Sequence, residues 1–158
     1  MTKEKKQEFT LRITQANPTE MVVVLYEMTL CYLEEAKNAM ETGEWAAYKV
    51  MANKTKACLL ELTHSLHLEY EIAANLMQLY QYCLDQLSDA GIYNTAEPLE
   101  EVYNVLTKLH EAYIQVAKQD NRSTVMQNSQ TVYAGLTYGK TNLTENMADQ
   151  GGNRGFLI

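Results

Sequence analysis

The order of apolar and polar residues along the chain follows the period of the α-helix in four segments. The first segment opens with Asn17 as a helix cap, Pro18 at the first helical position and Glu20 near the positive end of the helix dipole. Gly43 follows the last periodic residue, where glycine commonly ends a helix. The pattern predicts helices over about residues 17–42, 44–66, 69–90 and 96–118.

Each of these segments has an apolar face that can point into a core. Four helices of this length, joined by short links, predict an all-α fold, namely an antiparallel up-down four-helix bundle. The residues predicted to face inward are Met21, Leu25, Met28, Tyr32, Ala36 and Ala39 in the first helix; Ala47, Met51, Cys58, Leu59, Leu62 and Leu66 in the second; Ile72, Ala73, Leu76, Leu79, Tyr80, Cys83, Leu84 and Leu87 in the third; and Leu99, Val102, Leu106, Leu109, Tyr113 and Val116 in the fourth.

The segments on either side of the predicted bundle differ from it in composition. Residues 1–16 are polar and charged, and we expect them to form an N-terminal arm with the apolar residues Phe9, Leu11 and Ile13. Residues 119–158 hold five of the seven glycines and show no sustained period, which predicts a flexible or docked C-terminal tail. The bundle itself takes residues 17–118 and is expected to form one domain.

The first two predicted helices carry more apolar surface than one buried stripe needs. Such a surplus is typical of a helix that is central in a bundle, or of one that offers its outer side to a partner, and the pattern leaves both open. The surplus residues are Val22, Val23, Tyr26, Leu30 and Leu33 in the first helix, and Val50, Ala57 and Leu60 in the second.

Composition and charge exclude several classes of partner. The net charge of −7 and the pI near 5.0 argue against binding to nucleic acid or to an anionic membrane, because both require clustered cations. The longest apolar run, residues 21–26, is too short to span a bilayer, and the first residues do not resemble a secretory signal. Three widely spaced cysteines are typical of reduced thiols. We therefore expect a soluble protein of the cytosol without membrane insertion.

Catalytic and metal-binding patterns are largely missing. Glu61 and His64 have the spacing of one half of a di-iron site, but a second such pair on another helix is not found. No glycine-rich phosphate loop is present, and neither Cys31 nor Cys83 has a histidine nearby in sequence to act as a base. The sequence predicts a protein that is not an enzyme and that uses no metal or cofactor.

Three stretches together resemble the flagellar export chaperones of the FliS family. The resemblance spans about residues 13–118, and the order, spacing and lengths of the helices agree with that family. The stretches are NPTEMVVVLYEMTLCYLEEAKNAMETGEW at residues 17–45, EIAANLMQLYQYCLDQLSDAGIYN at 71–94 and EPLEEVYNVLTKLHEAYIQV at 97–116.

The resemblance implies a small antiparallel bundle that binds the C-terminal segment of flagellin in the cytosol. Such a chaperone prevents premature polymerisation and delivers its client to the flagellar export apparatus. The client would lie in apolar grooves, and the N-terminal arm would cover part of them when no client is bound. Uncovered apolar surface also allows self-association. The alternative is a regulatory helical-bundle adaptor that binds another amphipathic helical partner.

On this reading, the surplus apolar residues of the two helices are candidates for the partner-binding surface. The apolar residues of the arm are candidates for an N-terminal plug over that surface. The partner-binding candidates are Val22, Val23, Tyr26, Leu30, Leu33, Val50, Ala57 and Leu60, and the plug candidates are Phe9, Leu11 and Ile13.

Overall fold

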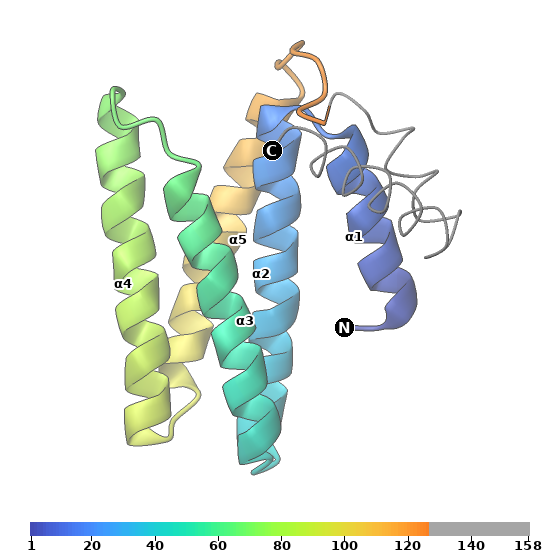
Figure 1. Ribbon diagram of the computed structural model, residues 1–158. Coiled ribbons are helices and arrows are strands. Elements are labelled where there is room, and N and C mark those ends of the chain that lie inside the picture. The colour runs from blue at the N-terminus through green and yellow to red at the C-terminus, as the bar shows by residue number, and fades with distance from the viewer. Residues whose placement is uncertain (127–158) are drawn as a thin grey trace, which may run out of the picture. The chain divides into compact units, whose positions relative to one another are not determined.

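The computed structural model describes residues 1–126, which form five helices and no strand in that part of the chain (Figure 1). A single compact unit covers Met1–Val125. The predicted all-α fold is confirmed, whereas the predicted tail lies outside the described residues from residue 127 onward. The helices are α1 (Lys3–Gln15), α2 (Pro18–Glu41), α3 (Trp45–His64), α4 (Glu71–Tyr93) and α5 (Glu97–Ala117).

Helices α2 to α5 form the bundle and run alternately up and down, with α2 packed against both α3 and α5 (Figure 1). The predicted start of α2 is confirmed: the Asn17 side chain accepts a hydrogen bond from the Glu20 backbone, and the Glu20 carboxylate accepts one from the Asn17 backbone. Gly43 has a φ of +74°, a left-handed conformation that glycine adopts without a steric penalty, and the chain turns there into α3.

The segment predicted as an N-terminal arm contains a helix. In α1, the Thr2 side chain caps the helix by accepting a hydrogen bond from the Lys5 backbone. Lysine, glutamate and glutamine, which are good helix formers, make up much of the first turns. Helix α1 packs against α2, outside the four-helix bundle (Figure 1).

The buried face of α2 is rotated from the predicted one. Tyr26 and Leu33 are buried in the core, whereas Met21, Met28 and Tyr32, which were expected there, are only half-buried. Because α2 packs against α1, α3 and α5, its apolar residues surround most of the helix. The period therefore identifies the helix but does not fix which side faces the core.

The other three core stripes are mostly as predicted, with buried residues such as Leu62, Tyr80 and Leu106. Three assignments are wrong. Ile72, in the first turn of α4, is 66% exposed, and Val116, in the last turn of α5, is 52% exposed, because the bundle ends there. Leu79 is also exposed, since it lies on the flank of α4 and not on the line through Leu76, Tyr80 and Cys83. The buried core comprises Tyr26, Leu33, Ala36, Ala39, Met40, Tyr48, Leu59, Leu62, Leu76, Tyr80, Cys83, Leu87, Ala90, Leu99, Val102 and Leu106.

Two tyrosines of this core, Tyr26 and Tyr80, lie close to a third, Tyr113, which is partly buried. The hydroxyl groups of Tyr26 and Tyr80 form a hydrogen bond with each other, and the ring of Tyr113 lies 5.4 Å from that of Tyr26 between centroids. Burial raises the pKa of both Tyr26 and Tyr80. Each hydroxyl group thus has a hydrogen-bond partner in the core, where a polar group without one would lower the stability of the fold.

A cluster around Asp120 holds the chain that leaves α5 against the start of α2. The Asp120 carboxylate accepts hydrogen bonds from the Thr19 hydroxyl (2.5 Å) and from Nη2 of Arg122 (2.6 Å). The Asn17 side chain donates to the Asp120 carbonyl oxygen (3.2 Å). Arg122, and then Thr19, hold the pKa of the Asp120 carboxyl well below its usual range.

We expect Asp120 to make stability depend on acid pH. A carboxyl whose pKa is lower in the folded than in the unfolded chain stabilises the fold above the unfolded pKa, about 3.9, and loses that contribution as the pH falls toward the folded pKa. Asp120→Asn should therefore unfold at a lower urea concentration than the unmodified chain at pH 7, and the difference should shrink at about pH 3 and below. An equal difference at both pH values would contradict the prediction.

Candidate partner-binding site

The structure places the predicted partner-binding residues in two settings on α2. Val23, Tyr26 and Leu33 are buried. Val22 and Leu30 are half-buried and pack against the core. These side chains belong largely to the bundle interior, so the α2 candidates do not form one open surface.

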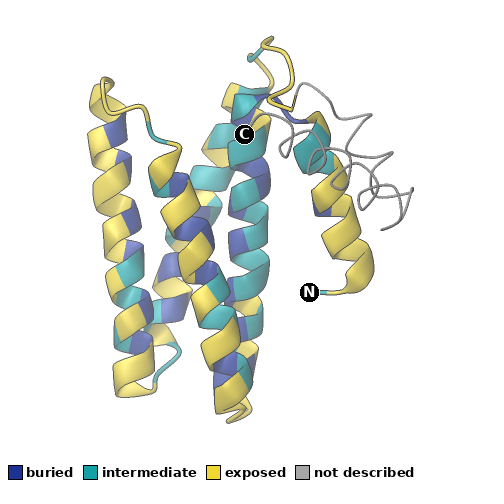
Figure 2. Cartoon of the chain, in the orientation of Figure 1, coloured by how far each residue is buried: buried dark blue, intermediate teal, exposed yellow. Residues whose placement is uncertain are grey.

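The α3 candidates are on the surface instead. Val50 is 50% exposed, Leu60 is 39% exposed, and Ala57 between them is exposed as well. These three residues, which we call the α3 outer strip, follow one another at helical spacing on the side of α3 that faces away from Leu59 and Leu62. Figure 2 shows that much of the surface of α3 is exposed. No described element covers the strip, and the exposed polar residue Asn53 lies among its apolar residues.

A groove with an apolar lining lies between the start of α2 and the link from α3 to α4. Its volume is about 440 Å³. Val22, a predicted partner-binding residue, and Ile72, which was wrongly expected in the core, both line it. The groove brings together residues distant in sequence, including Leu66 and Tyr113, and no local pattern could have indicated it.

Helix α1 covers a third apolar region, on the side of α2 that faces away from the core. Val24 is buried there although it shares this side with Glu27 and Glu35. Both glutamates form ion pairs with the α1 region, Glu27 with Arg12 and Glu35 with the N-terminal amine. Helix α1 is therefore the element that shields Val24 from water.

The three predicted plug residues differ in burial. Phe9 is 2% exposed, and the guanidinium group of Arg12 lies 5.9 Å from the centre of its ring. Ile13 is half-buried and Leu11 is exposed. Of the three, Phe9 is the residue that anchors α1 by burial.

An ionic cluster joins α1 to α2 and α5. The Glu27 carboxylate accepts hydrogen bonds from Arg12 on both oxygens, with Nη2 to Oε1 at 2.9 Å, and Nε2 of His110 lies 3.2 Å from the same Oε1. Burial raises the pKa of Glu27, but the hydrogen bonds and charges of Arg12 and His110 outweigh burial and lower it overall. Glu27 thus remains ionised and holds α1 in place.

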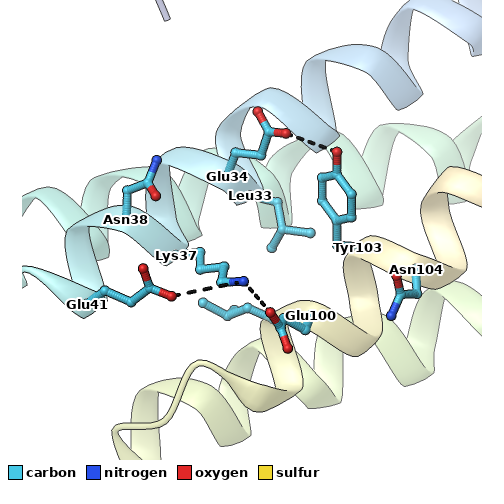
Figure 3. Close-up of a pocket in the computed structure, with 9 residues that line it drawn as sticks. Leu33, Glu34, Lys37, Asn38, Glu41, Glu100, Tyr103 and Asn104 are labelled. Atoms are coloured by element: carbon cyan, nitrogen blue, oxygen red, sulfur yellow. Dashed lines mark hydrogen bonds and ion pairs between the residues drawn. The ribbon is translucent and has the colours of Figure 1, made fainter.

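Another groove lies between the second half of α2 and the first half of α5, with a volume of about 660 Å³ (Figure 3). Leu33 and Leu99 line it, together with the carboxylates of Glu34, Glu41 and Glu100. Two interactions bridge its helices. Lys37 pairs with Glu100, and the Tyr103 hydroxyl donates to Glu34 at 2.9 Å. The groove is acidic, and its charged groups serve mainly to pair with one another.

The described residues contain no metal-binding cluster, and two of their three thiols are buried. Within residues 1–126, no three His, Cys, Asp or Glu side chains converge to hold a metal ion. Burial raises the pKa of the Cys83 thiol to about 12, and it also raises that of Cys58, so both thiols stay protonated near neutral pH. None of the five described helices is long and apolar enough to cross a membrane.

Comparison with known proteins identifies the family of this chain. The family model described as "Flagellar protein FliS" matches residues 1–120. A flagellar secretion chaperone FliS of Campylobacter jejuni is 31% identical over 113 residues, which cover 70% of this chain and 86% of that protein. The flagellar secretion chaperones FliS of Salmonella typhimurium (27% identical, 66% of this chain, 80% of that protein) and of Bacillus subtilis (24% identical, 70% and 83%) are also similar. The resemblance found in the sequence is confirmed, and the chain belongs to the FliS family of flagellar proteins.

Proposed function

We propose that this protein is a cytosolic flagellar export chaperone that binds the C-terminal segment of flagellin. By covering that segment it would prevent premature polymerisation, and it would deliver flagellin to the flagellar export apparatus. Membership of the FliS family and the names of the similar proteins support the chaperone role. The structural observation that carries the proposal is the exposed α3 outer strip of Val50, Ala57 and Leu60.

The physical requirements of such a client agree with these surfaces. A segment that is disordered when free loses conformational entropy on binding, so the partner must supply preformed apolar surface that needs no ordering of its own. The α3 outer strip lies on a 20-residue helix of a packed bundle, and the groove beside Val22 and Ile72 is lined by residues from several helices. Both surfaces are therefore rigid enough to receive an apolar helix face.

We further propose that α1 acts as a plug, with Phe9 as its anchor. When α1 detaches from α2, Val24 becomes exposed to water, and apolar surface on α2 becomes available in addition to the α3 outer strip and the groove. Leu11 and Ile13 contribute less to this plug, because they are more exposed than Phe9. Surface uncovered in this way would also allow self-association when no client is present.

Calorimetric titration with the last 40 or so residues of the flagellin of the same organism tests the proposal. We expect one-to-one binding with a negative heat-capacity change, as for an apolar surface that orders its ligand. Val50→Asp should weaken binding by tenfold or more, because a carboxylate would be desolvated under the client. Ile92→Asp, at another exposed apolar residue, is the matched control and should bind like the unmodified chain.

A single outcome would overturn the chaperone proposal. If the flagellin segment binds neither the full chain nor a Phe9→Ala variant, in which the plug is loosened, flagellin is not the client. The alternative, a regulatory helical-bundle adaptor for another amphipathic partner, would then take its place. Circular dichroism of each variant establishes that the fold is intact before the binding results are compared.

A further inference from the structure

Charge is distributed unevenly over the bundle helices. Helix α3 contains three lysines and one glutamate, a net charge of +2. Helix α2 contains five glutamates and one lysine, and α4 contains three acidic residues and no cation. Helix α5 also has a net negative charge. Within a chain of net charge −7, α3 is the one bundle helix that is cationic.

The three lysines border the α3 outer strip. At about 100° per residue, Lys54 lies on one side of the strip, and Lys49 and Lys56 lie on the other. Lys49 and Lys56 are exposed, and the Lys54 ammonium lies 5.3 Å from the centre of the Tyr32 ring. Any segment seated on the strip would place its own flanking side chains beside these ammonium groups.

These lysines are not neutralised by the rest of the described chain. Arg12, Lys37 and Arg122 all form ion pairs with carboxylates, but within residues 1–126 neither Lys49, Lys54 nor Lys56 has a carboxylate within 4.0 Å. Glu61 lies on the same side as Lys54 and reduces the positive charge there. The side with Lys49 and Lys56 is therefore the more cationic border of the strip.

We propose that Lys49 and Lys56 determine specificity, so that the α3 outer strip selects a helical client segment whose apolar face is bordered by aspartate or glutamate. The apolar residues supply affinity, whereas the lysines discriminate between partners: they attract an acidic flank and repel a basic one, and their effect grows as the contact loses water. This inference rests on the proposed function, because it names the chemistry of the client that the strip receives.

Two designed helical peptides of about 20 residues test the inference with the full chain. They share the same leucines at helical spacing and differ only in the residues that border the leucines, glutamate in one and lysine in the other. The net charge of the protein by itself favours the lysine peptide. We nevertheless expect the glutamate peptide to bind at least tenfold more tightly, with a preference that declines as salt is raised.

Charge-reversal variants test whether Lys49 and Lys56 cause the preference for the glutamate peptide. Lys49→Glu/Lys56→Glu should abolish or invert the preference. Lys108→Glu/Lys118→Glu, which changes the net charge equally at exposed positions of α5 and its C-terminus, should retain it. Equal affinity for both peptides, or a preference unaffected by Lys49→Glu/Lys56→Glu, would overturn the inference.

The outcomes also separate this inference from the proposed function. If the flagellin segment binds but neither peptide is preferred, the chaperone role stands and the selectivity of α3 is wrong. If the glutamate peptide is preferred but the flagellin segment does not bind, the strip selects acidic helices of another partner, and the chaperone role is wrong. If neither peptide binds, the strip is not a docking surface and the inference fails.

Discussion

Leu106→Ala is expected to lower the free energy of unfolding by about 2–5 kcal/mol, because it removes buried methyl groups and leaves a cavity that a packed core fills only in part. Leu106 lies on the inward face of α5 and is fully buried among the core residues of the other helices. Urea unfolding followed by circular dichroism measures the change. Val116→Ala, at an exposed position of the same helix, is the matched control, with an expected change within about 0.5 kcal/mol.

The result would also test the placement of α5. An unfolding midpoint that does not move on Leu106→Ala would mean that Leu106 is not enclosed and that α5 is not closed onto the bundle as described. A shift as large for Val116→Ala would mean that the end of α5 is buried, which contradicts its exposure.

Tyr26→Phe is expected to destabilise the fold by about 1–3 kcal/mol, although it removes only one oxygen atom. The change leaves the hydroxyl of Tyr80 in the core without the partner that it has in the native fold. Tyr80→Phe should cost a similar amount, for the same reason. Tyr26→Phe/Tyr80→Phe removes both groups together and should cost clearly less than the sum of the two single changes.

The double-mutant cycle is measured by urea unfolding of the four proteins. Tyr93→Phe, at an exposed tyrosine, is the control and should be close to neutral. If the effects of the two single changes add, the two hydroxyl groups do not depend on each other, and the tyrosine pair does not act as a unit.

Sequence reasoning succeeded where local chemistry determines structure. The cap at Asn17, the turn at Gly43 and the inward stripe through Leu99, Val102 and Leu106 all depend on residues close together in the chain. The wrong predictions concern how the helices pack against one another. The side of α2 that faces the core is set by three neighbouring helices, and the exposure of Ile72 by where the bundle ends. Neither is encoded in a short window.

The candidate site shows the same division. The α3 outer strip was indicated by the sequence, because α3 carries a second apolar strip besides its buried one, but the pattern left open whether Val50 and Leu60 are exposed. The groove beside Val22 could not, since it forms only when distant segments meet. The helical character of α1 was missed although a signal existed: Thr2 can cap a helix, and the residues that follow favour helix formation.

The three thiols sit at different depths, and an alkylating reagent would therefore react with them at separate times. Cys58 and Cys83 are buried in the bundle, so they become reactive only when the whole domain unfolds. Cys31 is half-buried on the side of α2 that α1 covers, and its interaction with Lys5 of α1 raises the pKa of that lysine. Cys31 should therefore be alkylated while the bundle remains folded, and its rate of alkylation should rise when α1 detaches from α2.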